Sequence, residues 1–219
     1  MEPAAVAFDL DDTLAVTRRD RETLLTESMR AVGAPPRSRD AYLDAHAEHL
    51  TARSREPVFE RLLDDVDTDA DPTDLAAAYR SRINTALEPV PGVEEMLSTL
   101  RERYRLGLLT NGPVIAQRSK LRALGWADAF DVALVTGDLD AGKPDASAFT
   151  ALVDALGTDP AETVFVGDDV TADIQGAADA GLVAVQVGYP DGPSPSSVAT
   201  VHVDRADLAE RLPAIIDAL

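Results

Sequence analysis

Two kinds of hydrophobic spacing divide the chain into two regions. Residues 4–10 form a short, mainly apolar run that predicts a buried strand. From residue 18 to residue 87, apolar residues recur at three- and four-residue intervals, with Pro and Gly clusters between the repeats. This spacing predicts four helices, near residues 19–32, 40–54, 57–66 and 73–87, and no strand among them.

Short strands and helices alternate after a Pro-Val-Pro-Gly segment at residues 89–92, which we interpret as a hinge. The predicted strands are residues 105–109, 132–135, 163–166, 183–187 and 201–203, and the predicted helices are residues 114–124, 146–156, 171–180 and 207–219. Repeated strand–helix units are typical of a parallel sheet covered by helices on both faces. The predicted fold class is therefore α/β, a Rossmann-like open parallel sheet with an inserted all-helical unit. Residues 1–16 and 90–219 would form the sheet domain, and residues 17–89 the insertion.

The charge of the chain limits its partners. With 20 basic and 39 acidic residues, the formal net charge is −19, and only Lys120 and Lys143 are lysines. Nucleic acid and anionic membrane surfaces would be repelled, so both are predicted not to be partners. An acidic, lysine-poor surface favours a halophilic protein, because molar salt screens self-repulsion. Acidic drift in a GC-rich genome would give the same composition.

Several protein classes are excluded by what the sequence lacks. There is no cysteine, which excludes disulfides, thiolate metal sites and a cysteine nucleophile. No run approaches the ~20 apolar residues that span a bilayer. The N-terminal segment has no basic region or cleavage site of a signal peptide. These features predict a cytoplasmic protein.

Polar residues follow the predicted strands, at the edge of an open parallel sheet where ligands bind. They are Asp9, Asp11 and Thr13 after the first strand, Thr110 and Asn111 after the second, Lys143 after the third, and Asp168, Asp169 and Asp173 after the fourth. Crowded carboxylates repel one another unless a cation lies among them, and oxygen ligands without Cys or His suit Mg²⁺. Mg²⁺, a lysine and a hydroxyl together can neutralise the negative charge of a phosphoryl group during its transfer. A carboxylate is then the natural nucleophile. The Asp-x-Asp-x-Thr pattern alone is weak, since residues 69–73 repeat it in an acidic turn.

The order of these motifs resembles that of the haloacid dehalogenase superfamily of phosphohydrolases. Residues 6–14 (VAFDLDDTL) resemble its first motif, 108–112 (LLTNG) its second, 142–145 (GKPD) its third and 166–181 (VGDDVTADIQGAADAG) its fourth. The resemblance covers essentially the whole chain, including a four-helix cap between the first two motifs. It is greatest to small-metabolite phosphatases, such as phosphoglycolate, nucleotide and sugar phosphate phosphatases.

The resemblance implies a catalytic role for each motif residue. Asp9 would attack phosphorus and become an aspartyl phosphate, and Asp11 would protonate the leaving oxygen and then activate water. Mg²⁺ would be held by the Asp9 carboxylate, the Asp11 backbone carbonyl and Asp168. Thr110, Asn111 and Lys143 would bind the substrate. Thr13 would brace the first loop beside the substrate, and Asp173 would orient metal-bound water or Lys143. Asp169 stands where the family often has Ser or Thr and is not assigned as a ligand.

Three other functions remain open. A phosphomutase shares all four motifs. A 2-haloacid dehalogenase needs neither a proton on its leaving group nor a metal, so Asp11 and the acid cluster argue against it. A phospho-acceptor signalling module also combines acids, Mg²⁺ and a lysine, but such modules are shorter and have no large helical insertion.

Side chains outside the motifs carry further expectations. Lys120 lies between Arg118 and Arg122 in a predicted helix and is expected at the surface, whereas Trp126 is expected to pack. In the second predicted helix of the insertion, four residues share one helical face: Tyr42, His46, His49 and Arg53. We expect this face to be solvated unless it faces the substrate. The neighbouring stripe is expected to face the core of the insertion: Leu43, Ala47 and Leu50.

Overall fold

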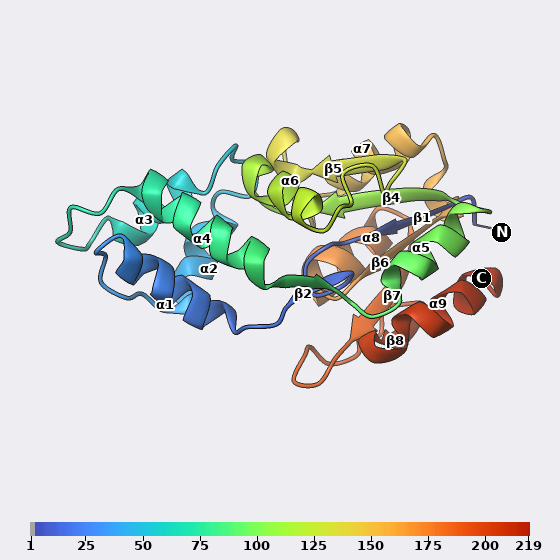
Figure 1. Cartoon of the computed structure of the whole chain (residues 1–219). Helices are drawn as coiled ribbons and strands as arrows, with labels where there is room; N and C mark the ends of the chain where they lie inside the picture. The colour runs from blue at the N-terminus through green and yellow to red at the C-terminus, as the bar shows by residue number, and fades with distance from the viewer. Residues whose placement is uncertain (1–2) are drawn as a thin grey trace.

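A six-stranded parallel sheet forms the centre of the computed structural model, which describes residues 3–219 (Figure 1). Its strands are β1 (Ala5–Phe8), β4 (Arg105–Thr110), β5 (Val132–Val135), β6 (Thr163–Gly167), β7 (Val183–Gly188) and β8 (Val201–Asp204). The spatial order is β5-β4-β1-β6-β7-β8, so the strand order reverses beside β1. Because β1 pairs with both β4 and β6, the residues that follow these three strands emerge side by side.

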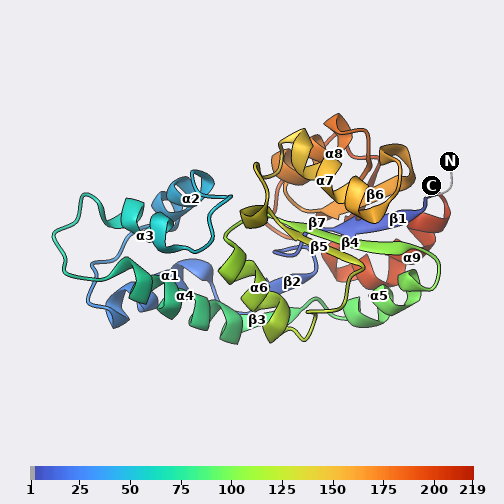
Figure 2. The same ribbon diagram turned by 90° about the horizontal axis from the view of Figure 1, so that it is seen from above.

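Helices cover both faces of the sheet (Figure 2). One face packs against α5 (Val93–Arg101) and α9 (Leu208–Asp217), and the other against α7 (Ala146–Leu156) and α8 (Gly176–Asp179). Alternate residues of β1 enter the two cores: Val6 and Phe8 lie in the first, Ala5 and Ala7 in the second. This two-sided burial explains why the strand reads as an apolar run without polar alternation.

The insertion forms a separate lobe beyond the carboxyl ends of the strands (Figure 1). Its helices are α1 (Arg21–Ala31), α2 (Arg39–Ala47), α3 (Glu56–Leu63) and α4 (Pro72–Ala86). They bury a core of their own, with Leu25, Phe59, Leu75 and Tyr79 almost fully inaccessible. Two short antiparallel strands, β2 (Ala15–Thr17) and β3 (Leu87–Pro89), connect this lobe to the sheet.

The segment between α2 and α3 docks the lobe onto the sheet domain through backbone carbonyls. The Leu50 carbonyl accepts from Thr136 Oγ1 at 3.0 Å, and the Arg53 carbonyl accepts from the backbone N–H of Ile115 at 2.9 Å. Ile115 belongs to α6 (Val114–Ala123), whose Ser119 accepts a hydrogen bond from Asn84 of α4. Both the segment after α2 and the helix α4 of the lobe are therefore in contact with the sheet domain.

Most predicted elements match the structure, and the main differences concern five elements. α5 was not predicted, although its residues 93, 96, 97 and 100 have helical spacing. β2 and β3 were missed because three residues are too few to show alternation. The predicted helix 40–54 ends at Ala47, and a turn follows. The predicted helix 171–180 opens with a π-helical turn at Val170–Gln175 before α8.

None of the helices between residues 3 and 219 is both long and apolar enough to cross a bilayer.

Candidate active site

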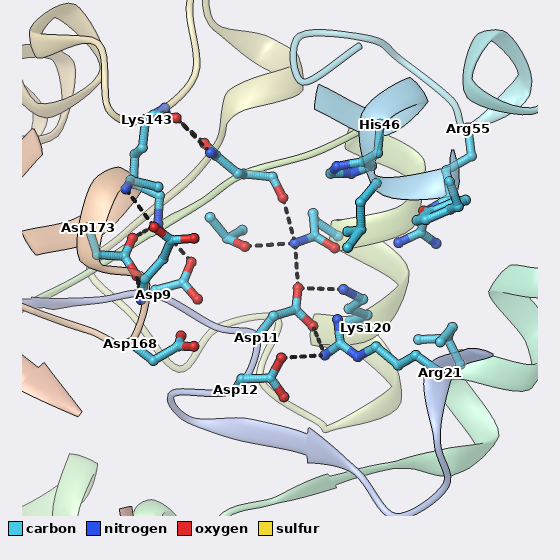
Figure 3. A pocket seen from close by; sticks show the side chains of 18 of the residues that line it. Asp9, Asp11, Asp12, Arg21, His46, Arg55, Lys120, Lys143, Asp168 and Asp173 are labelled. Atoms are coloured by element: carbon cyan, nitrogen blue, oxygen red, sulfur yellow. Dashed lines mark hydrogen bonds and ion pairs between the residues drawn. The ribbon is translucent and has the colours of Figure 1, made fainter. Parts of the chain in front are cut away.

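A cavity of about 240 Å³ lies between the carboxyl ends of the strands and the helical lobe (Figure 3). The loops after β1, β4, β5 and β6 line one side of it, and α1, α2, α4 and the segment before α3 line the other. Of the candidate residues, those that line it are Asp9, Asp11, Thr110, Asn111, Lys143, Asp168, Asp169 and Asp173. Residues spread over 165 positions of sequence are thus gathered at one site, as expected from the strand order.

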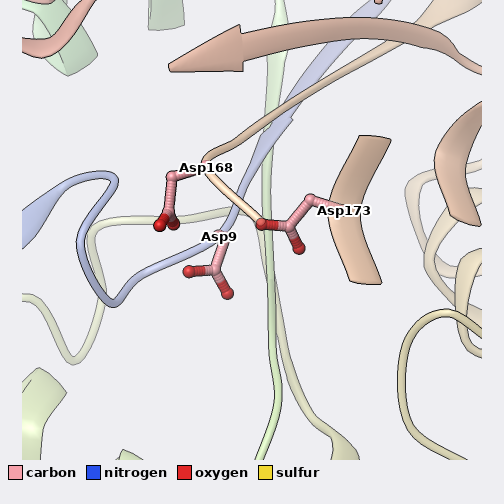
Figure 4. Close-up of side chains that lie close together, drawn as sticks. All are labelled: Asp9, Asp168 and Asp173. Atoms are coloured by element: carbon pink, nitrogen blue, oxygen red, sulfur yellow. The ribbon is translucent and has the colours of Figure 1, made fainter. Parts of the chain in front are cut away.

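Three carboxylates form the acidic side of the cavity (Figure 4). Ligand oxygens of Asp9, Asp168 and Asp173 lie within 4.8 Å of one another, and all three side chains are buried. Burial raises the pKa of Asp9 to about 7, with further contributions from the charges of Asp173 and Asp11. Burial also raises the pKa of Asp168 to about 8, with repulsion from Asp9 and Asp173 added. The crowded negative charge is therefore only partly compensated by the protein.

Lys143 supplies that compensation. Its Nζ donates to Asp9 at 2.7 Å and to Asp173 at 2.6 Å, and the side chain is 2% exposed. Asp173 also accepts from the backbone N–H of Asp169 at 3.1 Å, so both of its oxygens are engaged. Asp9 and Asp168 retain free oxygen lone pairs. The buried carboxylates of Asp9 and Asp168 have raised pKa values, and among residues 3–219 Lys143 is the one ammonium bonded to either of them. The residues present thus fit a hard divalent cation.

Hydrogen bonds behind the carboxylates fix their positions. Thr13 Oγ1 donates to Asp168 at 2.9 Å, and Tyr189 donates to the other oxygen of Asp168 at 3.3 Å. Thr13 is fully buried and is not among the residues that line the cavity. The Asp169 carboxylate accepts from the backbone N–H groups of Thr171 and Ala172, both at 2.8 Å. This carboxylate therefore caps the π-helical turn.

The loop after β4 connects two of the motifs. Asn111 bonds to Lys143 twice: its Nδ2 donates to the carbonyl at 2.8 Å, and its Oδ1 accepts from the backbone N–H at 2.9 Å. Thr110 Oγ1 accepts from Gln117 at 2.7 Å, which leaves the hydroxyl hydrogen available to a ligand. Gly112 has φ +125°, and a Cβ there would lie 3.2 Å from His46, so glycine permits the lobe to approach this loop.

Asp11 is held by three side chains at the entrance to the acid cluster (Figure 3). One of its oxygens accepts from Lys120 Nζ at 2.5 Å and from Gln117 at 2.9 Å, and the other accepts from Arg21 at 3.1 Å. Burial by itself would raise the pKa of Asp11, but Lys120 and Arg21 outweigh burial and hold it well below its usual range. Asp11 is therefore an ionised carboxylate in this arrangement, linked to both the sheet domain and the lobe.

The expectation that Lys120 lies at the surface is wrong. The side chain is 2% exposed and points into the cavity, and burial lowers its pKa to about 8 despite the opposing charge of Asp11. Gln117 precedes it by one helical turn on the same buried face of α6, while Arg122 is exposed. The scarcity of lysine was a signal that the sequence offered. The chain is rich in arginine and has only two lysines, Lys120 and Lys143, and both line this cavity.

The expected stripe on the lobe is also corrected. Because α2 ends at Ala47, residues 49 and 53 are not on its face, and Arg53 is exposed. Tyr42 and His46 both line the cavity, and Tyr42 is also buried in the lobe core. The neighbouring stripe does not face that core, since Leu43 is 43% exposed and Ala47 is exposed. Trp126 packs against the sheet domain as expected, with its indole N–H donating to Glu94.

Replacement of Lys120 by Met tests whether the pair with Asp11 matters for turnover. Without the ammonium, Asp11 loses its shortest contact and one of the two cations that keep it ionised. We expect kcat to fall about tenfold or more, because small displacements of Asp11 would be costly in the role that the family resemblance implies for it. Arg122→Met, on the exposed face of the same helix, is the matched control and should retain wild-type kcat. Equal steady-state kinetics for the two variants would contradict the expectation.

Comparisons with known proteins agree with the geometry. The family model "haloacid dehalogenase-like hydrolase" matches residues 3–181. A glyceraldehyde 3-phosphate phosphatase from Methanopyrus kandleri is 32% identical, over 84% of this chain and 83% of the relative. An N-acetylmuramic acid 6-phosphate phosphatase from Pseudomonas aeruginosa is 30% identical, over 86% and 84%. The crystal structure of a HAD phosphatase from Thermococcus onnurineus is similar with a TM-score of 0.67 at 28% identity, and the match covers 95% of this chain and 97% of that one.

Proposed function

The chain belongs to the haloacid dehalogenase-like hydrolases, and we propose that it is a Mg²⁺-dependent phosphatase that hydrolyses a small phosphorylated metabolite through an aspartyl phosphate. The observation that carries the proposal is the Asp9 carboxylate, which lies at the end of the central strand between Lys143 and Asp168. The relatives named as phosphatases of small phosphorylated compounds support the reaction class.

In the first half of the proposed reaction, Asp9 is the nucleophile. Mg²⁺, held by Asp9, the Asp11 carbonyl and Asp168, would neutralise charge on the phosphoryl group. An Asp9 oxygen forms a bond to phosphorus as the bond to the leaving oxygen breaks. Lys143 Nζ, already 2.7 Å from Asp9, and the free hydroxyl hydrogen of Thr110 bind the phosphoryl oxygens.

Asp11 is the proposed site of proton transfer. It gives a proton to the leaving oxygen, then takes one from the water that hydrolyses the aspartyl phosphate, and Asp9 is regenerated. The contacts with Lys120 and Arg21 keep Asp11 ionised, which suits the second half of the reaction. For the first half, Asp11 must separate from at least one of these cations. Arg21 belongs to the lobe, so movement of the lobe would achieve that separation.

We assign residues 17–89 as a cap over the site and residues 1–16 and 90–219 as the catalytic domain. The hydrogen bonds of the Leu50 and Arg53 carbonyls with the sheet domain support this assignment, since they hold the insertion against that domain. A closed cap excludes water from the phosphoryl group and selects the leaving group.

Release of inorganic phosphate from a panel of small phosphomonoesters tests the proposal. With Mg²⁺ present, we expect turnover of p-nitrophenyl phosphate and of at least one metabolite ester. A phosphomutase would instead isomerise a sugar phosphate without net phosphate release. Metal-independent halide release from a haloacid would identify a dehalogenase. A stable aspartyl phosphate without turnover would identify a signalling module.

The acidic surface leads to a second proposal, that the protein is halophilic and works in a cytoplasm of high salt. The net charge of −19 should destabilise the folded state in dilute buffer, and screening should relieve this. We expect the melting temperature and kcat/KM both to rise from dilute buffer to molar KCl. A melting temperature that stays constant over this range would contradict the halophilic assignment and leave the catalytic one untouched.

A further inference from the structure

Arg55 is a cation in the cavity whose charge is not matched by the protein. It follows the turn after α2, is 7% exposed, and lies on the cap side of the cavity beside His46 (Figure 3). Within residues 3–219, its Nε and Nη1 atoms are buried and have no hydrogen-bond partner. A buried ionised donor without a partner is strongly unfavourable. A ligand that supplies acceptor atoms would remove this cost.

The other cations of the cavity have partners. Lys143 is paired with Asp9 and Asp173, and Lys120 with Asp11. Arg21 contacts Asp11 and Asp12, and Arg39 donates to the Tyr79 hydroxyl at 3.2 Å and lies over the Tyr42 ring. In the part of the chain that the structure describes, the Arg55 guanidinium has only the face of Tyr79, with 5.3 Å between the guanidinium carbon and the ring centroid. Among residues 3–219 that line the cavity, the buried donors without a partner thus all belong to Arg55, and the other unpartnered buried atom there is an acceptor, the Oε1 of Gln117.

No acid from residues 3–219 lies on the wall of the cavity that carries Arg55. All acids that line the cavity come from the catalytic domain: Asp9, Asp11, Asp12, Asp168, Asp169 and Asp173. The cap contributes arginines, tyrosines, apolar side chains and His46. Burial, followed by the charges of Arg55, Lys120 and Arg39, lowers the pKa of His46 to about 3, so the imidazole is neutral. In a chain of net charge −19, this wall is a local positive region that faces the leaving-group side of the site.

We propose that Arg55 binds a carboxylate on the leaving group, so that the preferred substrates are small phosphorylated carboxylic acids. The inference rests on the proposed phosphatase function. A guanidinium matches a carboxylate with two parallel hydrogen bonds, and the single unpartnered cation matches a single negative charge. A second phosphate would bring up to two charges to this one cation. The cavity of about 240 Å³ restricts the acid to a short carbon chain.

Matched substrate pairs test the proposal on the wild-type protein with Mg²⁺. Phosphoglycolate is compared with hydroxyethyl phosphate, and phosphoglycerate with glycerol phosphate, so that each pair differs only in the carboxylate. We expect kcat/KM to favour the acid about 10- to 100-fold, as for a charged hydrogen-bonded pair. Equal values within both pairs would overturn the proposal without any variant. A propanediol bisphosphate preferred over both acids would also overturn it, in favour of a second phosphate.

Arg55→Met then assigns the preference to this side chain. The variant should lose the 10- to 100-fold preference, with kcat/KM for the neutral esters changed by less than about threefold. Arg53→Gln, two positions away and exposed, is the matched control and should keep the wild-type ranking. Retention of the acid preference by a folded Arg55→Met protein would overturn the assignment. If even p-nitrophenyl phosphate is not hydrolysed by the wild type, the phosphatase function itself fails, and this inference fails with it.

Discussion

Asp9→Asn is expected to abolish turnover, with kcat reduced about 10⁴-fold or more, because the amide is not a nucleophile toward phosphorus. The substitution keeps the shape of the side chain and removes one of three crowded buried carboxylates. The folded state should therefore survive, with a melting temperature of the metal-free protein no lower than that of the wild type. Steady-state phosphate release and thermal unfolding measure the two quantities.

The chain offers a matched control for this substitution. Residues 69–73 repeat the Asp-x-Asp-x-Thr pattern where the loop after α3 runs into α4, and Asp69, Asp71 and Thr73 are all exposed there. Asp69→Asn should have wild-type kinetics, since Asp69 is exposed and does not line the cavity. Rapid quench of the Asp11→Asn variant with labelled substrate should place any trapped label on Asp9. Label on a serine or histidine, or an active Asp9→Asn protein, would contradict the nucleophile assignment.

The residues that the sheet contributes to this site could be predicted from the sequence for a physical reason. Parallel strands all end at one edge, so residues that follow Phe8, Leu109 and Val166 must converge there whatever the helices do. The buried strands are marked by apolar runs, and the motif acids by their position after those runs. The prediction of the sheet core and of the candidate residues at its edge therefore depends on local signals.

The cap side was less accessible, because its contacts depend on where helices end and which face they turn inward. Arg53 and Arg55 are two residues apart in the segment after α2, yet one is exposed and the other is buried. The sequence around Lys120, with an arginine on either side, favours a solvated side chain. The packing of α6 against α4 and the bond to Asp11 bury it instead. Three-dimensional packing, rather than spacing, decides these positions.

Removal of Mg²⁺ with EDTA is expected to abolish activity, and its return should restore it, with a pH dependence set by Asp9 and Asp168. Their pKa values of about 7 and about 8 apply to the protein without metal, and a cation requires both carboxylates ionised. Binding of Mg²⁺ should therefore release about one to two protons at pH 6 and almost none above pH 9. Calorimetric titrations in buffers of different ionisation enthalpy measure this release directly.

The same pKa values predict how the metal-free protein responds to pH. Both folded-state values exceed the unfolded value of 3.8, so between these limits the folded state binds more protons than the unfolded state. The free energy of unfolding should then decrease as pH rises from about 4 to about 8, and saturating Mg²⁺ should oppose the decrease. Asp168→Asn removes one titrating group, so it should flatten the decrease and weaken Mg²⁺ binding. Proton release that is absent at pH 6, with a Mg²⁺ affinity unchanged between pH 6 and pH 9, would contradict a metal site built on Asp9 and Asp168.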